Sequence, residues 1–446
     1  MTRKKKLPVV KLADRDEAAA VTAGLPAVAA IALEDIAGAI GEGLLAFSCS
    51  AGLLVVQQIM AEEMTVKVGP KGRHDPDRVA TRNGTAPGSV ALGGRTVPVD
   101  RPRATLTGGG ELTLDSYALF SSTDLLTQLA VERMLAGVAT RRHGDVAEPI
   151  GAELEAVARG DSRSAVSRRF KAATTKALAE LLARDLGELD VAALMIDGIV
   201  FADVCCVVAL AITSDGTKVP VGLWDGDTEN GTVVTDLLAD LVARGLRYEH
   251  GLLVVIDGAK ALATGVRKVF GRRAIVQRCV LHKRRNCGSY LPNEFAGVTD
   301  RKLAAAFADT DPARGKRVVE GIARQLEANY PSAAASLREG LDDMFAVRRL
   351  GVSDRLARSL SGTNSIESMI SVVRTTTARV KRWTDTKMVR RWVGAGMLEA
   401  ERSFRRIKGC NDMPTLVAAV RAEVARRVAA DAGETVTPPE YDQAAA

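Results

Sequence analysis

Three acidic residues have the surroundings expected of a metal-dependent catalytic site. Asp197 follows the apolar run LMI, Asp257 follows LLVVI, and Glu367 lies in SGTNSIES. A glycine follows each aspartate, so we expect both carboxylates to project from strand ends into a loop-lined cleft, where ligands bind in open α/β sheets. Hard cations such as Mg²⁺ or Mn²⁺ prefer oxygen ligands. The residue types therefore point to phosphodiester chemistry with two metal ions about 3.5–4 Å apart across the scissile phosphate.

The segment between the two aspartates predicts elements that bring them together. FADVCCVVALAIT, SDG and TKVPVGLW read as strand, turn and strand, TVVTDLLADLVARGL as a helix, and HGLLVVID as a further strand. A three-stranded antiparallel meander, a crossover helix and a fourth strand parallel to the first would place Asp197 beside Asp257. The alternative for any single Asp-Gly pair is an ordinary Asx turn.

Glu367 is expected on a helix rather than on a strand. Thr363, Asn364 and Ser365 offer N-cap oxygens, and IESMISVVRTTTARV can continue as a helix. Acids in the order strand, strand, helix form the ribonuclease H-like arrangement, so the predicted fold class is α/β with a ribonuclease H-like core. Residues 299–360 are predicted to be a helical insertion in that core. Whether this insertion shapes a DNA channel or only packs stays open.

Longer stretches of the sequence resemble a known family. LMIDG, DGTKVPVGLWDGDTENG, VIDGAKAL, QRCVLHKRRN, TNSIES and RRWVGAGMLEAERSFRRIKG are similar to the bacterial Mutator-type insertion-sequence transposases, a DDE family. MLAGVATRR and GDSRSAVSRRF extend the resemblance into the N-terminal half. The resemblance implies that Asp197, Asp257 and Glu367 are the catalytic, metal-binding triad. It also implies that Cys279 and His282 form the C-x-x-H signature that follows the second aspartate in the family.

The C-x-x-H pair allows two interpretations. A structural zinc site would need two more ligands, and only Cys287 and His250 are nearby candidates. We favour a hydrogen-bonding and packing element that supports the active site through Cys279 and His282. The basic residues that follow would then contact DNA phosphates: Lys283, Arg284 and Arg285.

A second candidate site lies in residues 116–188. PIGAELEAVARG and SRSAVSRRFKAATTKALAELLARDL predict two helices around a Gly160-Asp161 break, with Ser162 opening the second helix. This is the spacing of a helix-turn-helix, in which the start of the second helix reaches base edges and phosphates. The candidate DNA-binding residues there are Arg163, Ser164, Ser167, Arg168 and Arg169. A polar helix start can equally be a cap on a solvated face, and the resemblance favours recognition of terminal inverted repeats.

The charge distribution also favours DNA as a partner. The formal net charge is +7, and residues 351–410 contain 13 Lys and Arg against five acids, a local excess of +8 around Glu367. The candidate phosphate-binding residues in this segment are Arg374, Arg379, Lys381 and Arg382. Arg374 follows Glu367 by two helical turns, although a generic surface arginine is the alternative. Trp383 and Trp392 are expected to be core anchors.

The composition predicts a multidomain intracellular protein. A chain of 446 residues with 47% hydrophobic residues can form two to four domains with substantial cores. The six cysteines show no disulfide-framework spacing, and the apolar run near the N-terminus is interrupted by Gly24 and Pro26. We therefore expect a cytoplasmic, nucleoid-associated protein without a membrane span.

The expected division of the chain follows these patterns. Residues 1–115 should form an N-terminal region of helices and short β-strands with arginines on its faces, and residues 116–188 the helical DNA-binding region. The core should occupy residues 189–298 and 361–410, interrupted by the insertion at 299–360, and residues 411–446 should form a C-terminal helix and tail.

The resemblance further implies a function. A transposase of this kind would cleave and transfer strands at the ends of an insertion sequence by two-metal phosphoryl transfer. Its partners would be double-stranded DNA, both terminal inverted repeats and target DNA, and the chain would act as a homodimer or larger assembly. Two alternatives remain: a ribonuclease H-like nuclease without end recognition, and a domesticated sequence-specific DNA-binding regulator without transposition activity.

Overall fold

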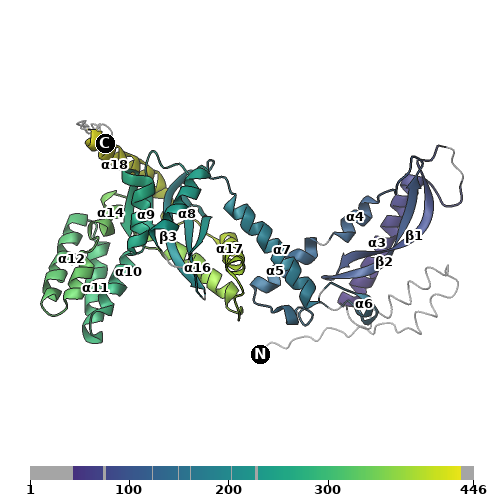
Figure 1. The fold of residues 1–446 in the computed structure, drawn as a ribbon, viewed down its shortest axis with the longest axis horizontal. Helices are drawn as coiled ribbons and strands as arrows, with labels where there is room; N and C mark the ends of the chain where they lie inside the picture. Colours follow the sequence, from purple (N-terminus) through teal and green to yellow (C-terminus); the bar gives the residue numbers. More distant parts are fainter. Residues whose placement is uncertain are drawn as a thin grey trace, which may run out of the picture. The chain divides into compact units, whose positions relative to one another are not determined.

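The computed structural model describes residues 44–73, 77–122, 124–148, 150–160, 162–201, 203–226 and 230–432. The chain divides into two compact units, Met1–Ala173 and Thr174–Ala446. Figure 1 shows the elements of both. The expected N-terminal tail, the part of the first expected helix before residue 44, and the C-terminal tail from residue 433 lie outside the described residues.

The first unit contains a long β-hairpin packed on a helix. Helix α3 (Leu44–Val68) lies against strands β1 (Ala80–Leu92) and β2 (Arg95–Leu106), which pair antiparallel. The expected β region is present, but the expectation of short strands is wrong. Gly93 and Gly94 both have positive φ and close a two-residue turn, so pairing continues from Leu92↔Arg95 to Ala80↔Leu106 with one bulge.

Helices follow the hairpin, most of them short. These are α4 (Asp115–Ser121), α5 (Asp124–Leu135), the 3₁₀ turn η1 (Thr140–Arg142), α6 (Ala152–Val157) and α7 (Arg163–Leu182). The expected break between two helices before residue 163 is present, and the Ser162 hydroxyl accepts a bond from the Ala165 N–H at 3.3 Å, as an N-cap does. The boundary between the two compact units falls within α7.

The second unit is built on a five-stranded mixed sheet. Its strands are β3 (Val191–Phe201), β4 (Val204–Thr213), β5 (Lys218–Gly226), β6 (Leu252–Ile256) and β7 (Ala274–Arg278). Their order is β5-β4-β3-β6-β7, with β3, β4 and β5 antiparallel in sequence and β6 parallel to both β3 and β7. The expected meander, crossover helix α8 (Gly231–Ala243) and parallel strand beside β3 are therefore confirmed.

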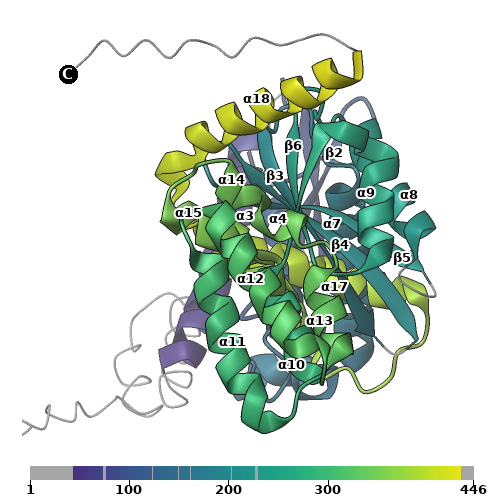
Figure 2. The ribbon, with the colours of Figure 1, turned by 90° about the vertical axis from the view of Figure 1, so that its left-hand side faces the viewer.

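Helices cover both faces of this sheet, as Figure 2 shows for α8 and α18. Helices α8 and α9 (Lys260–Phe270) pack on one face, against side chains such as Leu194 and Ile196. Helices α16 (Asn364–Thr377), α17 (Thr386–Ser403) and α18 (Met413–Ala432) pack on the other, against Ala193 and Met195. This alternation follows from the two-residue period of a strand, which assigns successive side chains to opposite faces.

The segment between β7 and α16 is helical, as expected. It contains α10 (Val280–Ser289), α11 (Asn293–Ala308), α12 (Pro312–Glu327), α13 (Pro331–Arg338), α14 (Ala346–Arg349) and α15 (Asp354–Leu360). Helices α10 to α13 enclose their own hydrophobic core, which includes Leu303, Phe307 and Phe345. Three 3₁₀ turns complete the unit: η2 (Gly271–Arg273), η3 (Asp342–Phe345) and η4 (Cys410–Asp412). Across the described parts of both units, every helix is too short or too polar to span a bilayer.

Candidate functional site

Asp197 and Asp257 lie at equivalent positions on neighbouring strands. The parallel pairing of β3 with β6 ends at Ile196↔Ile256, and each aspartate is the residue that follows this last pair. Asp257 stands directly after the end of β6, as predicted. The prediction that Asp197 also ends a strand is wrong, because β3 continues to Phe201 through antiparallel pairs with β4, including Asp197↔Val208. The long partner strand β4 therefore fixes the backbone on both sides of Asp197.

Strand alternation assigns both aspartates to one face of the sheet. On β3, Ala193 and Met195 belong to the core beneath α16, and Asp197 continues this set of alternate residues. On β6, Leu253 and Val255 belong to the same core, and Asp257 continues their set. The two carboxylates therefore lie on the face that α16 covers, and α16 carries Glu367 in its first turn.

Both aspartates make short local bonds to the backbone that follows them. One oxygen of Asp197 accepts from the Gly198 N–H at 2.9 Å, and one oxygen of Asp257 accepts from the Ala259 N–H at 2.7 Å. The second contact is the Asx turn that was considered as the alternative. Each of these bonds involves one of two carboxylate oxygens, so turn formation and ligand binding are compatible.

The electrostatic environment of Asp197 favours the binding of a cation. Burial and the negative charge of Asp257 raise the pKa of Asp197 to about 6, and Glu367 adds a smaller effect in the same direction. The Gly198 N–H and His282 oppose this shift. Carboxylates that disfavour one another's ionisation are a donor set that a divalent cation stabilises. The oxygen-rich composition of this cluster thus fits Mg²⁺ or Mn²⁺.

Thr363 fixes the position of Glu367. Thr363 occupies the predicted N-cap position of α16, is fully buried, and donates its hydroxyl to Glu367 Oε1 at 2.7 Å. The expectation that its side chain caps the helix is wrong, because this hydroxyl makes no capping bond to the helix backbone. The capping position instead gives the acid a hydrogen-bond donor one turn away.

Cys279 and His282 lie beside Glu367. Thr363 Oγ1 is 3.3 Å from His282 Nδ1 and 3.3 Å from Cys279 Sγ, and His282 Nδ1 is 3.8 Å from Glu367 Oε1. A hydroxyl has one hydrogen, so its short contact with Glu367 identifies the acceptor. Thr363 Oγ1 can then accept from a protonated His282, which gives a chain of bonds from the imidazolium through the hydroxyl to the carboxylate.

The pKa shifts of this pair agree with a charged histidine. The hydrogen bond with Cys279 raises the pKa of His282 to about 9, against the effect of burial, and the charges of Cys279, Glu367 and Asp197 act in the same direction. Burial acts to raise the pKa of the Cys279 thiol, but bonds with His282 and Thr363 outweigh it and lower that pKa. A cationic His282 partly compensates the acid cluster at neutral pH.

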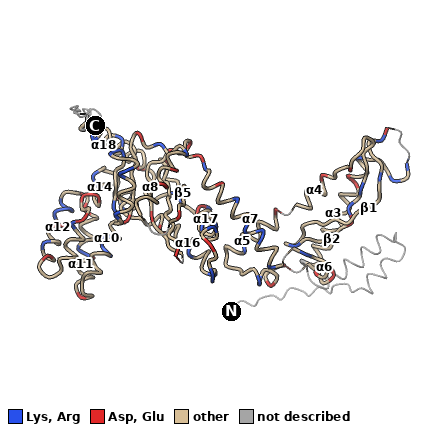
Figure 3. Tube along the Cα trace, in the orientation of Figure 1, with Lys and Arg blue, Asp and Glu red and all other residues tan. Residues whose placement is uncertain are grey.

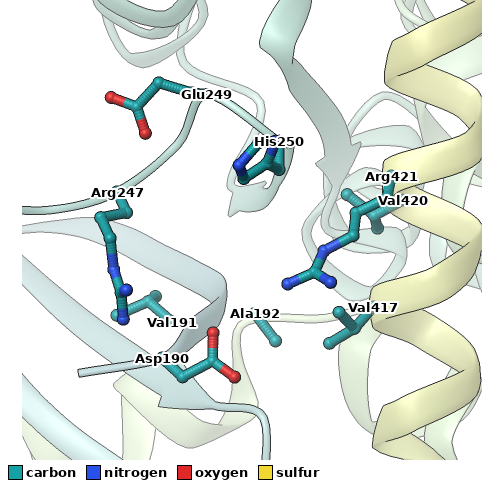
Figure 4. Close-up of a pocket in the computed structure, with 10 residues that line it drawn as sticks. Asp190, Val191, Ala192, Arg247, Glu249, His250, Val417, Val420 and Arg421 are labelled. Atoms are coloured by element: carbon teal, nitrogen blue, oxygen red, sulfur yellow. The ribbon is translucent and has the colours of Figure 1, made fainter. Parts of the chain in front are cut away.

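The two further zinc ligands considered from the sequence lie elsewhere. Cys287 is buried in the core of α10 to α13, where burial raises the pKa of its thiol to about 11. His250 precedes β6 and lines a pocket with Asp190, Arg247 and Arg421 (Figure 4), whereas Asp257 follows the other end of that strand. Ligand atoms of Cys279, His282 and Glu367 do lie within 4.8 Å of one another, which fits a hydrogen-bonded cluster as well as a metal site.

Most of the candidate DNA-binding residues on α7 are exposed. Arg163, Ser164, Ser167 and Arg168 lie on its first two turns and face solvent. Arg169 differs, because it is partly buried and its guanidinium donates to the Gly160 carbonyl. This contact links α7 to the backbone that precedes it, so Arg169 has a structural role in addition to any contact with DNA.

Figure 3 marks the positions of the Lys and Arg residues along the chain. The candidate DNA-binding residues of the second unit differ in exposure and pairing. Arg374, Arg379, Lys381 and Arg382 are exposed on α16 and on the segment that connects it to α17, and Arg285 is exposed on α10. Arg284 instead makes a bidentate ion pair with Asp300 at 2.8 and 2.6 Å.

Lys283 is only 4% exposed and donates to the carbonyls of Ser336 and Glu339, so its predicted phosphate contact is wrong. Trp392 is 7% exposed, and the Trp383 ring packs 5.3 Å from that of Phe201, as expected of core anchors. The DNA contacts predicted for the other residues stay predictions.

Several arginines of the hairpin are paired within the first unit. Arg95 contacts Glu155 at 3.0 Å, and Arg101 and Arg103 both contact Glu111, at 3.1 and 2.8 Å. Acids of the same unit therefore already compensate part of the positive charge of these arginines.

Comparison with known proteins gives the following relationships. The family model for "Transposase, Mutator family" matches residues 42–406. The chain is 30% identical to the transposase for insertion sequence element IS6120 of Mycolicibacterium smegmatis over 205 residues, which are 45% of this chain and 62% of the relative. It is 28% identical to the transposase for insertion sequence element IST2 of Acidithiobacillus ferrooxidans over 178 residues, which are 40% and 59% of the two chains. The match thus covers less than two thirds of either relative.

Proposed function

The chain belongs to the Mutator family of transposases, and from this premise we propose that it cleaves DNA strands at the ends of an insertion sequence and transfers them to target DNA. The observation that carries the proposal is the convergence of Asp197, Asp257 and Glu367 on one face of the sheet. Burial, together with the negative charges of Asp257 and Glu367, raises the pKa of Asp197 to about 6. Such perturbation in a cluster of acids is typical of functional sites.

The core is proposed to be ribonuclease H-like. Three antiparallel strands followed by two parallel ones, in the order β5-β4-β3-β6-β7, support this proposal. The acids lie on β3, after β6 and on α16, which is the strand, strand, helix order of that arrangement. The helical segment α11 to α15 interrupts the core between the second and third acids.

Asp197, Asp257 and Glu367 would hold two Mg²⁺ or Mn²⁺ ions. When bound, such ions activate a water for strand cleavage and stabilise the leaving 3′ oxygen. Thr363 orients Glu367 through its hydroxyl, and His282 supplies nearby positive charge. Phosphoryl transfer depends on positioning and electrostatics, so no Ser, Cys or His nucleophile is needed.

Recognition of the terminal inverted repeats is assigned to the exposed start of α7. Arg163, Ser164, Ser167 and Arg168 can reach base edges and phosphates from the first turns of a helix. The exposed cations of α10 and of the segment after α16 would contact the phosphate backbone, which positions the duplex without reading sequence. We propose that the active species on DNA is a homodimer or a larger assembly.

The decisive experiment measures cleavage of a labelled duplex that contains the terminal repeat and flanking DNA, in Mg²⁺ or Mn²⁺. Asp257→Asn and Glu367→Gln should each reduce the cleavage rate by about 10³-fold or more, because losing a metal ligand removes several kcal/mol of transition-state stabilisation. Binding of the repeat should change little. Asp236→Asn, which alters an exposed carboxylate of α8, is the matched control and should cleave normally.

Full cleavage by either variant would remove that residue from the active site. Specific binding of the repeat by the wild-type chain, without cleavage in either metal, would favour the alternative of a DNA-binding regulator. Cleavage that is indifferent to the repeat would favour a nuclease.

A further inference from the structure

A large basic groove lies in the second unit, outside the acid cluster. It has a volume of about 1010 Å³ and is formed by α15, the start of α16, the segment after α17 and the start of β5. The charged side chains that line it are cations: Lys218, Arg355, Arg358, Arg405, Arg406 and Lys408. Serines and Asn364 supply most of its other polar groups. We refer to this site as the basic groove.

The basic groove adjoins the helix that carries the third acid. Asn364, Ser365 and Ser368 line it, whereas Glu367, on the same first turns of α16, is not a lining residue and bonds Thr363 instead. A helix with its side chains is about 10–12 Å across, so a polymer bound in the groove would pass close to the acid cluster. The groove therefore lies within about one helix diameter of the turn that carries the third acid.

The wall formed by residues 404–409 is held in place by specific contacts. The Ile407 N–H donates to the Gly216 carbonyl at 2.9 Å, and the Ser359 hydroxyl donates to the Lys408 carbonyl at 2.9 Å. Gly409 has φ of +88°, and a Cβ there would meet the Leu356 nitrogen at 2.7 Å. Only glycine fits this approach, so the backbone between Arg405 and Lys408 is positioned before any ligand binds.

The cations of the groove differ in how far their charge is already compensated. Arg358 pairs with Asp354, and Arg406 pairs with Asp215 at 3.1 Å. Lys218 lies 5.3 Å from the centre of the Phe404 ring, and burial lowers its pKa. Arg355, Arg405 and Lys408 are exposed, and their charges are available to a polyanion.

We propose that the basic groove binds the phosphate backbone of the DNA that flanks the scissile junction, outside the terminal repeat. This inference rests on the proposed function, which places the junction at the acid cluster. The groove is at the upper limit of small-molecule pockets, and its lining residues include six cations but only three apolar residues, which suits an extended polyanion. Its cations come from three separate segments, so they can contact successive phosphates rather than one.

The test compares two duplexes in EDTA, so that binding is measured without cleavage. One duplex ends at the boundary of the repeat, and the other continues for about 15 bp, or roughly 50 Å, of flanking DNA. The variant carries Arg355→Gln, Arg405→Gln and Lys408→Gln. On the longer duplex its slope of log K against log salt should be flatter than that of the wild type by up to about 2.7, or about 0.9 for each lost contact. On the shorter duplex the slopes should agree.

A matched control variant carries Lys302→Gln, Arg317→Gln and Arg324→Gln, three exposed cations of α11 and α12. It removes the same charge and should leave the flank-dependent slope unchanged. The melting temperatures of both variants should match that of the wild type, because all six side chains are exposed.

Three results would overturn the proposal: an unchanged slope on the longer duplex, equal flattening on both duplexes, or equal flattening in the control variant. Cleavage by the wild type tests the proposed function separately. The two tests can also give opposite answers. If the triple variant loses the flank-dependent slope but the wild type never cleaves, the groove stays a DNA-binding site and the catalytic function is contradicted.

Discussion

Helices α7 and α16 carry candidate functional residues in their first turns, and these turns differ in burial and hydrogen bonding. Helix α7 starts with an exposed Ser162 cap, and Arg163, Ser164 and Arg168 face solvent. Helix α16 starts with Thr363, which is fully buried and bonded to Glu367. The first is exposed to solvent, and the second is part of a hydrogen-bonded interior.

This difference in burial predicts that substitutions in the two helices affect different properties, DNA affinity in one case and cleavage in the other. Exposed cations contribute through their number and spacing, so the loss of one weakens binding by a small step. A buried hydrogen bond to a charged group contributes more, because its loss leaves the charge unsatisfied. We therefore expect substitutions at the start of α16 to act on cleavage and those at the start of α7 to act on DNA binding.

Outside the three acids, the largest effect is expected for Thr363→Val, which keeps the shape of the side chain and removes its hydroxyl. Glu367 would lose the donor at 2.7 Å, and hydrogen bonds to charged groups are worth about 1.5–3 kcal/mol. Cleavage should therefore slow roughly 10- to 100-fold while the affinity for the repeat stays the same. Single-turnover cleavage and equilibrium binding measure the two effects.

Thr375→Val is the control for this substitution, because its exposed hydroxyl bonds only to the helix backbone, at the Ser371 carbonyl. It should cleave like the wild type. Normal cleavage by Thr363→Val would show that the two helix starts do not differ as described.

A second effect concerns stability and pH. The folded-state pKa of Asp197, about 6, lies above the ordinary value of 3.8. Between these values the folded protein binds more protons than the unfolded chain, so the free energy of unfolding falls as pH rises through this window. Asp197→Asn removes the titration and should stabilise the metal-free protein above pH 6 by about 1–3 kcal/mol.

Thermal unfolding in EDTA at pH 4 and pH 8 tests this expectation. The variant should melt several degrees higher than the wild type at pH 8, since 1 kcal/mol corresponds to about 2–4 °C in a large domain. The difference should disappear near pH 4. Added Mg²⁺ should stabilise the wild type more than the variant, and a variant that melts lower at pH 8 would contradict the described electrostatics.

A third prediction separates the roles of two adjacent arginines of α7. Arg168→Ala removes an exposed side chain and should cost about 1–3 kcal/mol of discrimination between repeat and random duplex, without lowering the melting temperature. Arg169→Ala removes the bond to the Gly160 carbonyl and should lower the melting temperature as well. Binding to both duplexes at one salt concentration, with thermal unfolding, separates these outcomes. Equal losses of stability in the two variants would contradict the assigned roles.

The sequence predicted the sheet better than the details of the site. Apolar runs such as LLVVI have strand length, and the tight turn SDG leaves little choice of pairing, so the meander and the parallel strand followed from pattern alone. The length of the hairpin strands was not predicted, and Pro87 and Pro98 are residues that disfavour long strands. In the structure these prolines lie within the paired segments of a two-stranded sheet, where one edge of each strand is free of ladder bonds.

The partners of the acids were harder to predict because they depend on contacts between distant segments. Thr363 and Glu367 are four residues apart, so a helical spacing offered a signal for their bond. The proximity of His282 depends on how α10 packs beside α16, which no local pattern encodes. The basic groove combines Lys218 with residues beyond 354, and charge counting could locate an excess there without revealing a groove.

The three acids come from β3, the end of β6 and the start of α16, with the whole helical segment α10 to α15 between the last two. During synthesis the first unit leaves the ribosome early, whereas Glu367 is made after four fifths of the chain. N-terminal regions generally fold first. If α7 binds the terminal repeat as we propose, a nascent or interrupted chain would hold DNA before the acid cluster is complete, and such fragments would compete with longer chains for the same ends.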